Sequence, residues 1–136
     1  MNVEIKVIPH KSQRYETVGD WYFSFGVVNA KKVKKNLEIK VSDMKNWKYE
    51  MLVAVHELVE FLLCEDRGII QKDCDRFDMK FEADRLKGKH SATAEPGRSK
   101  KAPYYREHKF ASKIEKLLAE ELNVNWKKYD DCVNEL

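Results

Sequence analysis

Cysteine, net charge and long apolar runs are all scarce in this chain of 136 residues. The three cysteines, Cys64, Cys74 and Cys132, are odd in number and show no Cys-x-x-Cys spacing, which favours free thiols in a reducing cytoplasm over a disulfide framework. The 26 basic and 23 acidic residues are mixed along the chain and leave a net charge of only +3. We therefore expect no nucleic-acid partner.

No apolar run in the sequence is long enough to span a membrane. The most apolar stretch, residues 51–68, is interrupted by the ionisable side chains of His56, Glu57, Glu60 and Glu65. The N-terminal sequence MNVEIKVIPH does not have the architecture of a signal peptide. These features predict a cytoplasmic protein without membrane contact.

A small antiparallel sheet is expected in residues 1–43 of a single domain that covers residues 1–136. The length suits one domain, and a hydrophobic fraction of 43% is typical of a globular chain. Alternating apolar residues predict the first strand, which should be half-buried, and also the third strand. Aromatic residues predict the second strand. A polar connection at 29–36 is expected between the second and third strands. It contains a basic run, which should keep this hairpin soluble. These segments are Val3–Ile8, Trp21–Phe25, Leu37–Val41 and the run Lys31–Lys35.

Helices are expected in the rest of the domain, residues 46–136, where the apolar period changes from two to between three and four. Gly68 is a suitable C-terminal cap for the first helix. A long loop at 88–103, rich in Gly, Ser, Pro and Lys, is expected to be mobile or functional. The fold class is therefore α+β, with about three strands followed by three to four helices: from Trp47, from Gln71 to Lys87, from about Tyr104 to Leu122, and from Trp126 to Val133.

The first helix contains the segment His56-Glu57-Leu58-Val59-Glu60, a His-Glu-x-x-Glu pattern. Residues four apart lie on the same face of a helix, so His56 and Glu60 can bind one ion from one side. Burying charges without partners is costly, and a divalent metal, zinc by preference, would neutralise them. A catalytic zinc needs a third protein ligand, and His108 in the third helix suits this better than His10 or His90.

This segment resembles the His-Glu-x-x-His helix of the zincin metallopeptidases, with Glu60 in place of the second histidine. In those enzymes two histidines bind zinc and the intervening glutamate is the general base. The resemblance implies that Glu57 is the catalytic base in the hydrolysis of a peptide or amide bond. The order of strands, motif helix and later ligand helix is similar to a reduced version of the zincin plan.

Three further residues are candidates for supporting the site. Asp78 is a candidate hydrogen-bond partner for a ligand histidine. Arg106 and Glu107 directly precede His108, and Arg106, like Tyr104 or Tyr105, is a candidate for stabilising an oxyanion. Packing and helix capping are the simpler roles for these residues.

Two alternatives to a metallohydrolase remain open. In the first, His56 is a hydrogen-bonded core histidine, Glu57 and Glu60 pair with arginines, and the protein is a non-catalytic binding partner of a host protein. In the second, Asp78 or Glu82 adds carboxylates to a metal-dependent phosphoesterase. The substrate and oligomeric state are not indicated by any pattern in the sequence.

Over nearly its full length the chain resembles a family of short uncharacterised proteins that are encoded by phages and prophages. That family resemblance implies a bacterial cytoplasm as the setting but no specific activity. The segments that carry it are Ser42–Met44, Trp47–Glu60, Phe77-Asp78 with Phe81-Glu82, Glu95–Gly97, Ala102–Tyr104, Arg106–His108 and Trp126.

Overall fold

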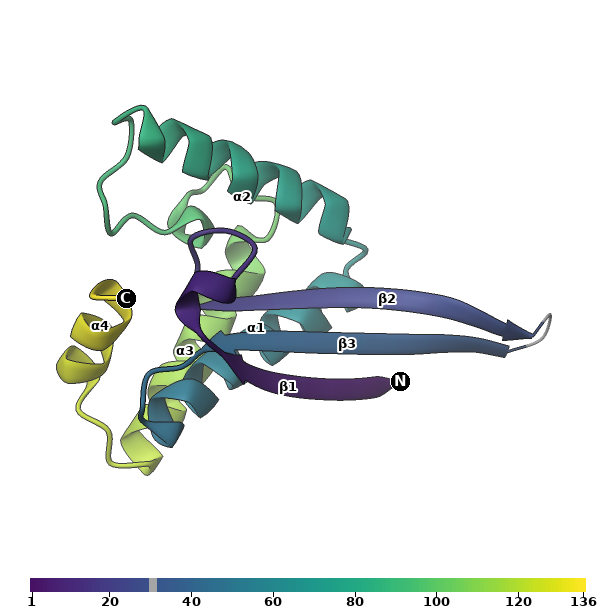
Figure 1. Ribbon diagram of the computed structural model, residues 1–136, viewed down its shortest axis with the longest axis horizontal. Helices are drawn as coiled ribbons and strands as arrows, with labels where there is room; N and C mark the ends of the chain where they lie inside the picture. Colours follow the sequence, from purple (N-terminus) through teal and green to yellow (C-terminus); the bar gives the residue numbers. More distant parts are fainter. Residues whose placement is uncertain (30–31) are drawn as a thin grey trace.

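The protein has an α+β fold, with a three-stranded sheet followed by helices, as expected (Figure 1). The computed structural model describes residues 1–29 and 32–136. The strands are β1 (Asn2–Ile8), β2 (Gly19–Asn29) and β3 (Lys32–Ser42), and a 3-10 turn, η1 (His10–Ser12), follows β1. The helices are α1 (Trp47–Asp66), α2 (Gln71–Leu86), α3 (Tyr105–Glu121) and α4 (Trp126–Asn134), with a second 3-10 turn, η2 (Pro96–Arg98), before α3.

The sheet is mixed, with strand order β1-β3-β2. Strands β2 and β3 form an antiparallel hairpin in which Trp21 lies opposite Ile39. Strand β1 instead runs parallel to β3, with Ile5 opposite Ile39, so the expectation of a purely antiparallel sheet is wrong. The chain reverses twice between β1 and β3, once around η1 and once in the hairpin, and two reversals restore the original direction.

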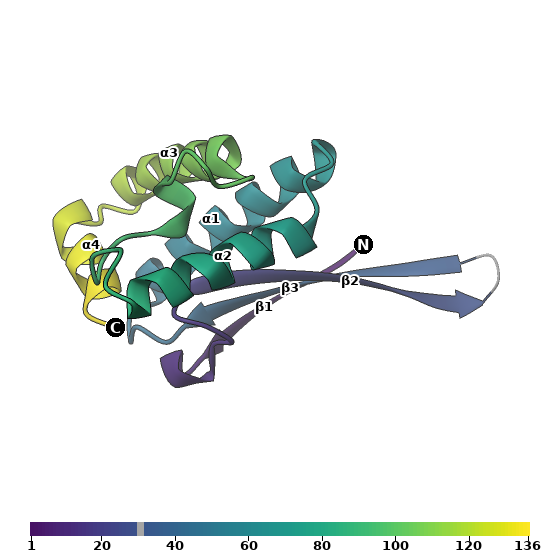
Figure 2. The same cartoon turned by 90° about the horizontal axis from the view of Figure 1, so that it is seen from above.

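The hairpin is longer than the sequence pattern indicated. The expected connection at 29–36 is largely strand, because β2 continues to Asn29 and β3 begins at Lys32. Of the basic run at 31–35, Lys31 lies outside the described residues. Beyond the helical layer the hairpin projects alone, as Figures 1 and 2 show, and Phe25 and Val27 are both 71% exposed there.

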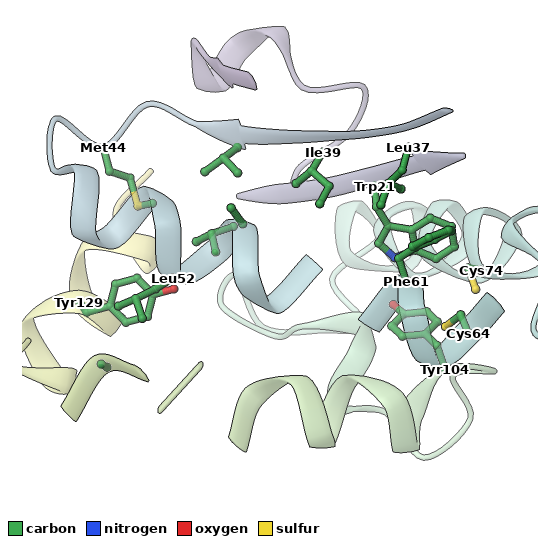
Figure 3. Close-up of a cluster of buried hydrophobic side chains, with 14 of the residues drawn as sticks. Trp21, Leu37, Ile39, Met44, Leu52, Phe61, Cys64, Cys74, Tyr104 and Tyr129 are labelled. Atoms are coloured by element: carbon green, nitrogen blue, oxygen red, sulfur yellow. The ribbon is translucent and has the colours of Figure 1, made fainter. Parts of the chain in front are cut away.

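The main core lies between one face of the sheet and the helices, which all lie on that side of it (Figure 2). The alternating residues Leu37, Ile39 and Val41 of β3 are almost completely buried. In the close-up of Figure 3, Phe61 from α1 lies beside Trp21, and their ring centroids are 5.4 Å apart in an edge-to-face arrangement. This contact anchors α1 on the sheet and fixes which side of α1 faces the other helices.

Strand β1 lies outside this core. Its apolar residues Val3, Ile5 and Val7 are 43–46% exposed, so the expectation of a half-buried first strand is wrong as regards burial. The physical reason is position, because β1 is an edge strand and the helices cover β2 and β3 instead. Alternation in a sequence indicates a strand, but burial depends on what packs above it.

Local signals define the ends of α1. The side chain of Asn46 accepts hydrogen bonds from the backbone of Lys48 and Tyr49, which caps the first turn. Gly68 has φ of +71°, the left-handed conformation that favours glycine after a helix. Within the described residues, no helix combines the length and the apolar character that crossing a membrane requires.

Candidate metal centre

Helices α1 and α3 bring His56, Glu60 and His108 together. Glu60 Oε2 lies 3.4 Å from His56 Nε2 and 2.9 Å from His108 Nδ1. The third side of this triangle, from His56 Nε2 to His108 Nδ1, is 3.1 Å. The structure therefore places the three residues expected as metal ligands in one cluster, although they are separated by up to 52 positions along the chain.

The size of this triangle suits a small divalent cation. Ligand atoms about 2.0–2.1 Å from a tetrahedral zinc lie roughly 3.3–3.4 Å from one another. The three observed separations of 2.9–3.4 Å need to open by only a few tenths of an ångström to reach this geometry. The donor set, two imidazole nitrogens and one carboxylate oxygen, is also one that zinc accepts.

Each of the three side chains is oriented by a partner on its far side. His56 Nδ1 lies 2.8 Å from Glu115 Oε2, and His108 Nε2 lies 3.6 Å from Glu95 Oε2. The other oxygen of Glu60 accepts a 3.0 Å hydrogen bond from the indole nitrogen of Trp21. A carboxylate behind each histidine and a donor behind the carboxylate is the arrangement typical of metal sites.

Glu115 is itself held in place from α4. The hydroxyl of Tyr129 donates a hydrogen bond to Glu115 Oε1, and both residues are buried. Glu95 lies just before η2, where Arg98 Nε is 3.3 Å from its carboxylate. The cluster is therefore supported by α1, α3, α4, strand β2 and the segment around η2.

Burial and neighbouring charges change the pKa of each group in the cluster. Burial alone lowers the pKa of His56, but Glu115 and Glu60 outweigh it and raise that pKa well above its ordinary value. Burial also opposes the charged form of His108, yet the hydrogen bond with Glu60 and the nearby carboxylate of Glu95 raise its pKa to about 9. Burial raises the pKa of Glu60, but the two histidines lower it to about 2.

With both histidines protonated, the three facing atoms are not all satisfied. Glu60 Oε2 is an ionised acceptor, so each histidine nitrogen must carry a proton to bond to it. Two protonated nitrogens would then face each other across 3.1 Å, and both would be donors. A single cation in the middle of the triangle accepts all three lone pairs at once, which removes this conflict.

Glu57 lies beside the cluster in a cavity of about 260 Å³ that His56, Glu60 and His108 also line. No hydrogen bond or ion pair to its carboxylate is found among residues 1–29 and 32–136. Burial, followed by the nearby charge of Glu60, raises the pKa of Glu57 well above its ordinary value. A partly buried carboxylate with a raised pKa is suited to proton transfer.

Two glycines allow close approach to these side chains. A Cβ atom on Gly97 would lie 2.5 Å from the ring of His108, so η2 can pack on this ring only with glycine at that position. A Cβ atom on Gly19 would lie 2.7 Å from Glu57 Oε1 and 2.5 Å from a methyl carbon of Val53. The loop at 88–103 is thus part of the site, and Arg85 fixes its first half through bonds to three backbone carbonyl groups.

The other candidate residues have different partners. Asp78 accepts hydrogen bonds from the hydroxyls of Tyr104 and Tyr15. Arg106 is exposed, and Glu107 is buried with its carboxylate 2.7 Å from Arg67 Nη1. None of these contacts reaches a proposed ligand directly.

Arg85, His10 and His90 also have partners outside the cluster. Arg85 pairs with Glu82, which leaves Glu60 to the two histidines and Trp21. His10 bonds to Ser42 and Glu16, and His90 stacks on Phe81 with ring centroids 3.8 Å apart.

Glu115, Glu95 and Trp21 belong to the site but were not predicted from the sequence. Glu115 had a signal, because it follows His108 by seven residues and so lies two turns along the same face of α3. The sequence held no such signal for Glu95 or Trp21. A loop and a strand were expected at these positions, and neither pattern shows which helix the side chain contacts.

No protein-family model matches this chain, and neither a curated protein nor a solved structure was found to match it. The resemblance to phage-encoded proteins therefore stays a prediction, as does the resemblance of α1 to the zincin helix.

Proposed function

We propose that His56, Glu60 and His108 bind one divalent metal ion, preferentially zinc, and that the protein is a metallohydrolase. The observation that carries the proposal is the triangle of facing lone pairs, each backed by its own hydrogen-bond or charge partner. A buried hydrogen-bond network does not require three ligand atoms to face one common point, whereas a metal site does. The donor chemistry favours zinc over magnesium, which prefers oxygen ligands alone.

The proposed reaction is hydrolysis of a peptide or amide bond. A zinc ion acts as a Lewis acid that polarises carbonyl oxygens and makes water more acidic. Glu57 would accept a proton from the attacking water and pass it to the leaving nitrogen, a role for which its raised pKa is suited. Gly19 keeps space open for this carboxylate at the start of β2.

The alternative functions predict different contacts. In a phosphoesterase, further carboxylates would surround the ion, yet Asp78 is bonded to two tyrosines and Glu82 to Arg85. In a non-catalytic binding protein, the cluster would be a polar core with protons in place of a metal. The raised pKa values of both histidines are compatible with that state in the absence of metal.

Metal content tests the site directly. Protein purified without an affinity tag would be analysed by elemental mass spectrometry, beside His56→Ala, Glu60→Ala and His108→Ala. We expect about one zinc per chain, lost in each variant. His90→Ala is the matched control, because His90 stacks on Phe81 away from the cluster and its loss should leave the zinc in place.

Catalysis needs a separate variant. Glu57→Gln should keep the zinc and the fold and lose turnover of a peptide or amide substrate by about 100-fold or more. Metal-free wild type, with all three ligand variants folded, would refute the metal site and leave the cluster as a hydrogen-bonded core. Turnover with Mn²⁺ or Mg²⁺ on phosphate esters, but none on amides, would instead favour the phosphoesterase.

A further inference from the structure

Within the described part of the chain, strand β1 presents an unpaired edge to solvent. It lies at one end of the strand order β1-β3-β2, and all residues from Asn2 to Val7 are exposed (Figure 1). An exposed edge strand carries a row of free N–H and C=O groups that can pair with another strand. No residue of β1 is among the proposed metal ligands or lines their cavity, so the inference does not depend on the proposed function.

The hydrogen bonds to β3 show which backbone groups are free. The carbonyl of Ile8 accepts a 2.8 Å bond from the backbone of Asp43, so the backbone groups of Ile8 point toward the β3 side. Backbone direction alternates along a strand, which turns the groups of Glu4 and Lys6 toward β3 as well. The N–H and C=O groups of Val3, Ile5 and Val7 consequently point outward.

The side chains of these three residues form an apolar strip. Val3, Ile5 and Val7 lie opposite Leu37, Ile39 and Val41 of β3 in register. They therefore share the face of the sheet that carries the core, but they remain 43–46% exposed because none of the described helices covers them. The edge thus offers both free backbone groups and uncovered apolar surface.

The sequence of β1 is complementary to itself in one antiparallel register. With Ile5 opposite Ile5 of a second copy, Val3 lies opposite Val7, and their outward backbone groups form hydrogen-bonded pairs. The same register places Glu4 opposite Lys6 twice, once on each side of the two-fold axis. A shift by two residues in either direction keeps the backbone pattern but sets Glu4 against Glu4 or Lys6 against Lys6.

We propose that β1 pairs antiparallel with β1 of a second copy of this chain, which makes a continuous six-stranded sheet in a two-fold symmetric dimer. The contact is isologous, as closed dimers require. It covers the free edge, brings the two apolar strips together on the helix-bearing face, and adds two opposite-charge cross-strand pairs.

Charge variants test this register. Glu4→Lys and Lys6→Glu each turn both attractive cross-strand pairs into repulsive ones, so each homodimer should dissociate about tenfold more readily than wild type. An equimolar mixture of the two variants should form a heterodimer, because every pair then has opposite charges. The double variant Glu4→Lys with Lys6→Glu should regain the wild-type homodimer. Sedimentation velocity over a micromolar concentration series, in the presence of EDTA, measures all four.

The control is Glu121→Lys, which makes the same change in net charge as Glu4→Lys at an exposed position of α3 and should dimerise like wild type. The fold should survive in all variants, because Glu4 lies opposite Glu38 and Lys6 opposite Lys40 of β3, so that neither reversal adds a like charge directly across the strand pair. Lys6→Glu gives up the ion pair with Glu38, which is solvent-exposed and therefore contributes little. Circular dichroism checks this.

Wild type that stays monomeric at high micromolar concentration would overturn the proposal. A dimer that is equally strong in Glu4→Lys, or a mixture no tighter than its components, would overturn it as well.

Discussion

The α1–α3 contact and the outer part of the sheet depart from ordinary burial in opposite ways. Between α1 and α3, the charged side chains of Glu60 and Glu115 are buried, at 6% and 9% exposure. On β1 and the hairpin tip, Val3 and Phe25 are exposed, at 46% and 71%. The buried carboxylates have counter-charges in the protonated histidines, which the proposed metal ion would replace, whereas the exposed apolar surface of the outer sheet is left uncovered by the described residues.

The two regions also differ in how completely their groups are held. Every residue of the metal cluster has an orienting neighbour from another element, whereas β1 is bonded along one edge only. Substitutions in the cluster should therefore be costly, and substitutions at the outer sheet should be tolerated by the single chain.

The largest effect is expected from Glu60→Ala. It removes the only acceptor shared by His56, His108 and Trp21 among the described residues and leaves buried polar groups without a partner. We expect a loss of about 3–5 kcal/mol in the free energy of unfolding, measured by urea denaturation in EDTA. Glu65→Ala, an exposed change of the same kind on α1, should cost about 0.5 kcal/mol or less. A similar cost for both would show that the cluster is not a connected unit.

Gly97→Ala should have the next largest effect. Its Cβ would meet the ring of His108 at 2.5 Å and displace either the ring or η2, at a cost of about 1–3 kcal/mol. Zinc affinity, measured by competition with a chromogenic chelator, should fall about tenfold or more because His108 would be misplaced. Gly26→Ala is the control, since nothing lies within 4 Å of a Cβ there. Unchanged affinity in Gly97→Ala would argue against His108 as a ligand.

Protonation of Asp78 should make the stability of the protein depend on pH. Burial raises the pKa of its carboxyl to about 6, although Tyr104 and Tyr15 donate hydrogen bonds to it. The folded state then holds this proton more tightly than the unfolded chain, so stability falls as pH rises from about 4 to 6. In Asp78→Asn that contribution, about 1–2 kcal/mol, should be absent, and the difference between the two unfolding curves measures it. A difference that does not change with pH would contradict the raised pKa.

The smallest effect is expected from Phe25→Ala at the tip of the hairpin. Because this ring is 71% exposed, its removal should change the free energy of unfolding by about 0.5 kcal/mol or less. Thermal denaturation of dilute protein is a sufficient measurement. A loss above about 2 kcal/mol in the free energy of unfolding would mean that another chain covers the ring under those conditions. The outer sheet would then not be the exposed region that the comparison assumes.

Sequence patterns indicated much of the fold because they are local. The alternation of Leu37, Ile39 and Val41, the helical period after Trp47 and the glycine at 68 correspond to a strand, a helix and a helix end in the structure. Each depends on a few neighbouring residues and on the geometry of one element. The expectation failed for the direction of β1 and for the burial of Val3, because both depend on distant segments.

By itself the sequence determined the elements and paired His56 with Glu60, since one helical turn places position i+4 beside position i. It also suggested His108, as a histidine on a helix with an apolar face. Only the tertiary structure set His108 Nδ1 2.9 Å from Glu60 and placed Glu115, Glu95 and Trp21 behind the cluster. The physical reason is that local periodicity specifies which face a side chain occupies, whereas the packing of α1 against α3 and the sheet decides what that face meets.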